Sequence, residues 1–197
     1  MKFDSRIKGS VTQALLKSLF EGSGYMIVPL GVEEVIRELT ILDSDAYKNL
    51  KLPKNLRCIP DFFVANDEMS ETWLVELKFR KQWNDDVRKS LSSQLRNQAE
   101  HWGPFHLLLF LGESCKKYDY KPSGWFGVAR LDYRESELVL LKNNDSVRCK
   151  WKDVKWDDLY RIQDVFDKIN AKENWQEGVL SKVQFILNQL NSIDAIE

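Results

Sequence analysis

Two apolar stretches stand close together in the chain: Arg57-Cys-Ile-Pro-Asp-Phe-Phe-Val64 and, after the polar turn Asn66-Asp-Glu68, Thr72-Trp-Leu-Val-Glu-Leu-Lys-Phe79. Aromatic and β-branched residues bounded by turn residues are typical of β-strands, so the two stretches predict a hairpin. The charged residues Glu76 and Lys78 interrupt the second stretch. Side chains two positions apart in a strand share a face, and the pair is therefore expected on one face of the sheet.

This charged pair needs a partner, because a strand so apolar is expected to be buried. Val75 and Leu77 take the opposite face, and Asp61 on the first arm of the hairpin can reach the pair. Two carboxylates, Asp61 and Glu76, provide the hard oxygen ligands that Mg²⁺ prefers. Lys78 can orient or help to deprotonate a water molecule beside the metal. The pattern predicts a site for phosphodiester hydrolysis, in which the metal polarises a phosphoryl oxygen.

The spacing of these residues resembles a known family. Pro60-Asp61, fourteen intervening residues and Glu76-x-Lys78 are similar to the motif of the PD-(D/E)xK nuclease superfamily, which includes restriction endonucleases, Holliday junction resolvases and repair nucleases. The resemblance covers roughly residues 8–112. It implies a restriction-endonuclease-like core and a Mg²⁺-dependent endonuclease, with Mn²⁺ as a substitute metal. It also implies that cleavage of DNA leaves a 5′-phosphate and a 3′-hydroxyl.

The resemblance also implies a third acidic ligand upstream of the motif. Gly31-Val-Glu33 follows a predicted strand in the arrangement that some members use, so Glu33 is the expected third metal ligand. Glu34 and Glu21 are the alternatives. On a helix Glu34 points about 100° away from Glu33, so only one of these two can face the site.

Further residues are expected around the metal ligands. The family tends to place a Gln or Tyr on the helix after the motif, and Gln98 and Gln94 are the matching candidates, with Gln98 on the helix stripe that faces the sheet. The basic residues Arg80 and Lys81 follow the motif strand directly. They are candidates for contacts to DNA phosphates. Basic residues are equally typical of strand ends that have no such role.

The remaining pattern predicts an α/β protein with a mixed central sheet flanked by helices and with a helical C-terminal tail. We expect one domain, in which residues 1–112 form the nuclease core and residues 113–197 form a sheet extension and C-terminal helices. The predicted helices are residues 10–22 (capped by Ser10), a short helix from Glu33, and residues 85–102. The other predicted strands are residues 25–30, 106–111, 124–131 and 137–142. Apolar stripes over 156–169 and 179–190 predict tail helices, for packing or for a dimer interface.

Composition excludes several classes of protein. The chain carries 29 Lys and Arg against 30 Asp and Glu, and its net charge of -1 excludes a polybasic binder. The cysteines Cys58, Cys115 and Cys149 are widely spaced, which favours reduced thiols in a cytoplasmic protein over disulfides or zinc. His101 and His106 are more typical of structural residues than of a general base. No apolar run is long enough to span a membrane.

Two alternatives remain open at this point. The chain could be an inactive relative that binds nucleic acid or a partner protein, or an α/β interaction module that uses its apolar tail helices. DNA is the expected partner, with RNA not excluded, and a homodimer or higher oligomer is expected because cutting two strands needs two centres. Intact Asp61, Glu76 and Lys78 favour the enzyme. The specificity of cleavage cannot be predicted from these residues.

Overall fold

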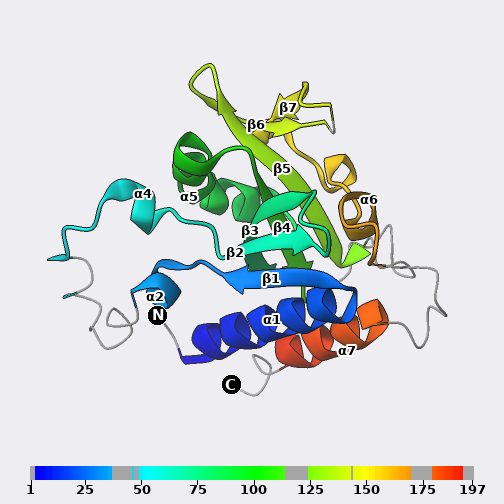
Figure 1. The fold of residues 1–197 in the computed structure, drawn as a ribbon. Coiled ribbons are helices and arrows are strands. Elements are labelled where there is room, and N and C mark those ends of the chain that lie inside the picture. The colour runs from blue at the N-terminus through cyan, green and yellow to red at the C-terminus, as the bar shows by residue number, and fades with distance from the viewer. Residues whose placement is uncertain are drawn as a thin grey trace.

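A seven-stranded mixed sheet forms the centre of the protein (Figure 1). The computed structural model describes residues 3–36, 46, 49–113, 124–142, 144–169 and 179–192. The strands lie in the order of the chain: β1 (Tyr25–Pro29), β2 (Phe62–Asn66), β3 (Thr72–Arg80), β4 (Phe105–Leu111), β5 (Phe126–Arg134), β6 (Glu137–Leu141) and β7 (Val147–Lys150). Only β3 and β4 are parallel, and every other neighbouring pair is antiparallel. A parallel pair needs a crossover, and the helix between β3 and β4 provides it.

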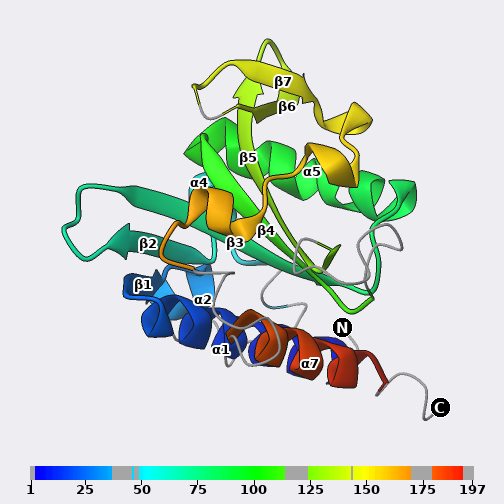
Figure 2. The same ribbon diagram turned by 90° about the vertical axis from the view of Figure 1, so that its right-hand side faces the viewer.

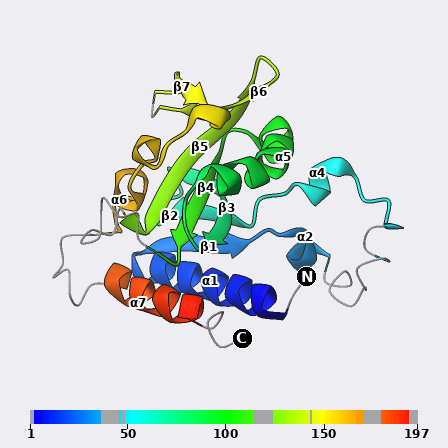
Figure 3. The same ribbon diagram turned by 180° about the vertical axis from the view of Figure 1, so that it is seen from behind.

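Helices cover both faces of this sheet. The described helices are α1 (Phe3–Gly22), α2 (Val32–Val35), α4 (Lys54–Arg57), α5 (Asp85–Trp102), α6 (Ile162–Val165) and α7 (Val179–Ser192), with the 3-10 turns η4 (Trp151–Asp153) and η5 (Trp156–Asp158). Figure 2 shows α1 and α7 side by side along one face of the sheet. In Figure 3, from behind, α5 lies on the far side of the strands from α1. Within the described ranges, every helix is too short or too polar to traverse a bilayer.

Two hydrophobic clusters follow from the alternation of side chains along the strands. Leu108 and Phe110 of β4 face the layer of α1, α6 and α7. Phe105, Leu107 and Leu109 of the same strand face α5 and the η4 segment. The central strand is therefore buried on both faces, as expected for a strand beside a parallel neighbour that carries helices on either side.

The element order up to residue 111 is the predicted one: a helix, three strands, a helix and a strand. Two boundaries were predicted wrongly. The first helix begins at Phe3, so Ser10 lies inside it and is not its cap. The second strand begins at Phe62 because Lys54–Arg57 forms a helical turn after Pro53, which leaves Arg57 outside the strand. The sheet continues from β4 into β5 across residue 112.

The prediction of a helix over residues 156–169 is also wrong, and the strand β7 was not predicted. β7 pairs with β6, and the apolar stripe over residues 156–169 contains only η5 and the four-residue α6. The reason lies at the edge of β5: β6 pairs with Leu131–Arg134 only, so the backbone of Val128 needs another partner. Tyr160 supplies it, with N–O distances of 2.9 and 2.8 Å to Val128. These bonds hold Tyr160 extended, and a continuous helix cannot form there.

The second tail stripe does form a helix, α7. Leu180 and Val183 pack into the cluster with α1, whereas Ile186 is 37% exposed and its neighbour Phe185 is 64% exposed. The described cysteines, Cys58 and Cys149, are free thiols, in agreement with the sequence analysis, and Cys115 lies outside the described residues.

Candidate functional site

Asp61 lies at the point where β1, β2 and β3 meet. The last β2–β3 pair is Phe62 with Val75, and Asp61 and Glu76 are the next residues in this register. Its carboxylate oxygen Oδ2 accepts a hydrogen bond from the backbone N–H of Leu77 at 2.8 Å. β3 continues past the start of β2, so Asp61 satisfies a backbone donor that β2 does not reach.

Glu76 is the most deeply buried charged side chain described here, with 1% relative exposure. Its carboxylate accepts hydrogen bonds from two amides: Gln98 Nε2 reaches Oε2 at 2.6 Å and Gln94 Nε2 reaches Oε1 at 2.8 Å. The ammonium of Lys78 forms an ion pair with Oε1, and its side chain is 18% exposed. These donors compensate the loss of hydration that burial of the carboxylate causes.

The sequence of α5 explains why both amides reach Glu76. Asn84 caps the helix, since its side chain accepts from the N–H of Val87 at 2.9 Å. Leu91 and Leu95 bury the face that packs on the sheet. Gln94 and Gln98 are one turn apart, and residues at this spacing lie above one another on a helix. Gln94 and Gln98 are the two candidates expected from the sequence, and the structure brings both to Glu76.

For Glu33, the expected third acidic ligand, the structure describes the position of the backbone. Leu30 and Gly31 both donate their N–H groups to the carbonyl of Asp61, at 2.8 and 3.3 Å, so the start of α2 lies beside the site. Glu33 is in α2, and its side chain lies outside the description. The alternatives contrast with it: Glu34 is exposed, and Glu21 is exposed at the end of α1, where it pairs with Lys17 at 3.7 Å.

The two basic residues after the motif are in different environments. Arg80 is half-buried at the end of β3, where its guanidinium donates to the carbonyl of Phe79 at 2.7 Å, and burial lowers the pKa of this group. Lys81 is exposed and forms an ion pair with Glu113 at 3.3 Å. The carbonyl orients the guanidinium of Arg80 without neutralising its charge, whereas Lys81 has an acidic partner, so the role of either residue in binding phosphate stays a prediction.

Cys58 belongs to the surroundings of this site, which the sequence analysis did not foresee. Burial raises the pKa of its thiol, the positive charge of Lys54 opposes the rise, and the negative charges of Glu100 and Glu76 add to it. Cys58 thus lies within electrostatic range of both the buried carboxylate and α4. Its position three residues before Asp61 was the available signal, although spacing alone does not show that the chain folds back here.

The donor set fits Mg²⁺ better than a metal that needs an all-protein cage. Among the described side chains, no group of three or more His, Cys, Asp or Glu residues is close enough to hold an ion. Mg²⁺ keeps several waters and uses one or two carboxylates together with substrate phosphates, so Asp61 and Glu76 would suffice. Gln98 Oε1 is buried and has no hydrogen-bond partner in the described part of the chain. It is an acceptor for a donor such as a metal-bound water.

Comparison of the chain with protein-family models, with curated proteins and with solved structures gives no match.

Proposed function

We propose that the protein is a Mg²⁺-dependent endonuclease that hydrolyses DNA phosphodiester bonds and leaves 5′-phosphate and 3′-hydroxyl ends. The observation that carries the proposal is the buried carboxylate of Glu76, which is in register with Asp61 and is held by Gln98, Gln94 and Lys78. A buried charge with dedicated donors, beside a second carboxylate, is costly for folding and is therefore a candidate functional group.

The order of elements supports the same proposal. A helix, three antiparallel strands, a helix and a parallel strand carry these residues, and this is the arrangement expected of a PD-(D/E)xK core. Asp61 directly precedes the second strand and Glu76 lies in the third, which supports the resemblance to the family motif.

Each residue has a distinct role in the proposed reaction. Asp61 and Glu76 would hold Mg²⁺, with Glu33 as a further ligand, and the metal supplies Lewis acidity and a bound water of lowered pKa. Gln98 and Gln94 fix the orientation of the Glu76 carboxylate. Lys78 positions the attacking water, since its ammonium is held beside Glu76 and is partly accessible to solvent.

Nicking of supercoiled plasmid DNA tests the proposal. The wild-type protein should nick the plasmid with Mg²⁺ or Mn²⁺ and not with EDTA, and a DNA ligase should reseal the nicks because ligation requires a 5′-phosphate and a 3′-hydroxyl. Glu76→Gln should abolish the activity. Asp86→Asn is the matched control, since Asp86 is an exposed carboxylate at the start of α5 and should not affect cleavage.

The outcomes separate the alternatives. DNA binding without cleavage in either metal would favour an inactive nuclease-like module, and neither binding nor cleavage would favour a protein interaction module. Cleavage of RNA but not of DNA would correct the substrate. Activity of Glu76→Gln equal to that of the wild type would contradict the assignment of the site.

A homodimer or higher oligomer is part of the proposal, because two centres are needed to cut two strands. Phe185 and Ile186 of α7 leave an apolar surface exposed, and such surfaces are commonly used for self-association. Sedimentation velocity should give more than one chain per particle, and Phe185→Asp should give monomers if α7 forms the interface.

A further inference from the structure

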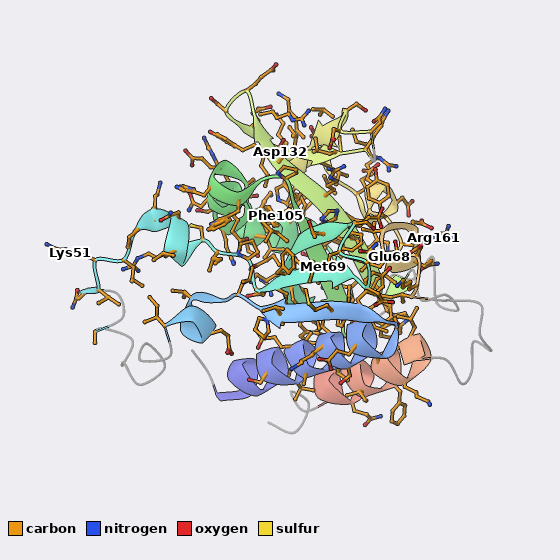
Figure 4. The ribbon with its side chains drawn as sticks, in the orientation of Figure 1. Lys51, Glu68, Met69, Phe105, Asp132 and Arg161 are labelled. Atoms are coloured by element: carbon orange, nitrogen blue, oxygen red, sulfur yellow. The ribbon has the colours of Figure 1, made fainter. Side chains whose placement is uncertain are left out.

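A basic segment leads directly into the candidate site. We call residues 49–57, which include α4, the basic arm. In Figure 1 the arm lies to the left of the sheet, beyond the ends of β1 and β2, and in Figure 4 Lys51 points away from the body of the protein. The arm ends four residues before Asp61.

The charge of this part of the chain differs from that of the whole. Four basic residues and no acidic residue lie between Asp45 and Asp61, whereas the complete chain has a net charge of -1. The four are Lys48, Lys51, Lys54 and Arg57, each three positions after the last. Lys48 lies outside the described residues. The arm is therefore a local concentration of positive charge in a chain whose net charge is close to zero.

Among the described residues, no acidic side chain pairs with Lys51 or Lys54 of the arm. Both lysines are exposed. Lys81 and Lys150, by contrast, pair with Glu113 and Glu137. The guanidinium of Arg57 donates to the carbonyl of Leu50, so Arg57 holds the shape of the arm.

The arm is fixed to the core beside the buried carboxylate. The indole of Trp102, at the end of α5, donates to the carbonyl of Asn55 in α4 at 2.9 Å. Cys58 follows α4 directly, and the charges of both Lys54 and Glu76 affect the pKa of its thiol. Lys54 and Asp61 are seven positions apart in the sequence, so at most about 25 Å of chain joins them. Successive phosphates of one strand of duplex DNA rise by about 3.4 Å along the helix axis, so the arm lies within about seven nucleotides of the site.

We infer that the basic arm binds the phosphate backbone of duplex DNA next to the bond that is cut, through Lys51 and Lys54. This inference rests on the proposed nuclease function. Residues 49–57 contain no aromatic side chain on which a base could stack, and the ammonium groups are flexible point charges without the rigid fork of a guanidinium. The arm therefore contributes affinity and position, and it contributes no sequence preference.

Salt-dependent DNA binding tests the inference without relying on cleavage. The full chain is titrated onto a fluorescent duplex in EDTA and at several salt concentrations, and the slope of log Kobs against log salt is measured. Lys51→Gln with Lys54→Gln should lower affinity at low salt by at least about tenfold and reduce the slope by about 1.8, since each lost phosphate contact removes about 0.9. Lys142→Gln with Lys152→Gln, exposed lysines near β6 and β7, is the matched control and should leave the slope unchanged.

The possible results test the inference about the basic arm separately from the proposed nuclease function. If the wild type binds and cuts DNA and the arm variant has the same slope as the wild type, the inference about the basic arm is refuted and the proposed nuclease function is not. Loss of affinity for single-stranded RNA with unchanged affinity for duplex DNA overturns the choice of DNA. Failure of the wild type to bind duplex DNA at low salt overturns both proposals. If the wild-type protein binds DNA without cutting it and the arm variant shows the expected change of slope, the inference about the basic arm stands and the proposed nuclease activity is refuted.

Discussion

Gln98 donates its amide to Oε2 of Glu76 at 2.6 Å, and the two side chains are only 3% and 1% exposed. A hydrogen bond to a buried charge is stronger than one between neutral groups, and removal of Gln98 takes away the described donor to Oε2, while Gln94 and Lys78 still bind Oε1. Gln98→Leu keeps the side-chain volume and should lower the free energy of unfolding by about 1.5–3 kcal/mol. Urea unfolding measures the change.

Gln94 provides the control for this prediction. Its amide binds the other carboxylate oxygen of Glu76 at 2.8 Å, but Gln94 is exposed, so water can replace the amide. Gln94→Leu should therefore change the free energy of unfolding by less than about 1 kcal/mol. Equal losses in the two variants would mean that water reaches both oxygens of Glu76 alike.

Asp61 has a structural role and a proposed chemical role, and two substitutions separate them. Asp61→Asn keeps an oxygen that can accept from the N–H of Leu77, so its stability should stay within about 0.5 kcal/mol of the wild type, whereas Asp61→Ala should lose about 1 kcal/mol. Both should lose cleavage, because a neutral amide is a poor ligand for Mg²⁺. Plasmid nicking and thermal unfolding are measured on the same samples. Full activity of Asp61→Asn at saturating Mg²⁺ would remove Asp61 from the metal site.

Lys78 should affect turnover more than DNA affinity. Its ammonium is paired with Glu76, and phosphate binding is spread over many basic groups, so Lys78→Ala should keep affinity within a few fold. Single-turnover cleavage should fall by about 100-fold or more, as for loss of a positioned catalytic group. Lys78→Arg should not restore the rate, because a planar guanidinium cannot take the place of a compact ammonium. A parallel fall of affinity and rate would identify Lys78 as a phosphate contact.

The hairpin and its charged face were predictable from the sequence because both depend on strict local rules. The alternation of Glu76 and Lys78 with apolar residues fixes their common face, and the helical period of α5 places Gln98 toward the sheet. The tail was not predictable in this way. Trp156 and Ile162 have helical spacing, but the hydrogen bonds between Tyr160 and Val128 depend on where β6 stops pairing with β5, which is a tertiary property.

The surroundings of the site show the same limit. The sequence places Cys58 near Asp61 along the chain, but only the folded arm brings it within range of Glu76. Gly127 is a further example: a Cβ there would lie 2.7 Å from Leu159 and 3.0 Å from Trp156, so the glycine permits the η5 segment to pack against β5. A glycine in an apparent strand is ambiguous until its neighbour across the fold is known.

His106 should make the protein less stable in acid. Its ring lies 6.3 Å from that of Phe166, and burial lowers the pKa of the imidazole from 6.5 to about 3, with the charge of Arg130 acting in the same direction. Between these two values the unfolded chain binds a proton that the folded protein does not. The free energy of unfolding should therefore fall as pH decreases below about 6.5, by up to about 1.4 kcal/mol per pH unit from this group.

His106→Phe isolates this contribution, since it keeps a ring beside Phe166 and cannot be protonated. The free energy of unfolding is measured by urea at pH 7 and at pH 5. Between these pH values the wild type should lose more stability than His106→Phe. His101→Gln is the control for removal of a histidine from an exposed position, at the end of α5. The same pH dependence in wild type and His106→Phe would show that other groups cause the acid sensitivity.

Tyr25 should hold the tail against the first strand. Its hydroxyl donates to Oδ1 of Asp167 at 2.9 Å and accepts from the N–H of Lys168 at 3.1 Å, and its ring is 3% exposed. Tyr25→Phe keeps the ring and removes both hydrogen bonds, so the free energy of unfolding should fall by about 1–2 kcal/mol, with faster proteolysis near Asp167. The ion pair of Lys168 with Asp67 is exposed, and Lys168→Ala should cost less than about 1 kcal/mol. If Tyr25→Phe had no greater effect than Lys168→Ala on either measurement, the attachment of the tail would depend on the packing of Phe166 alone.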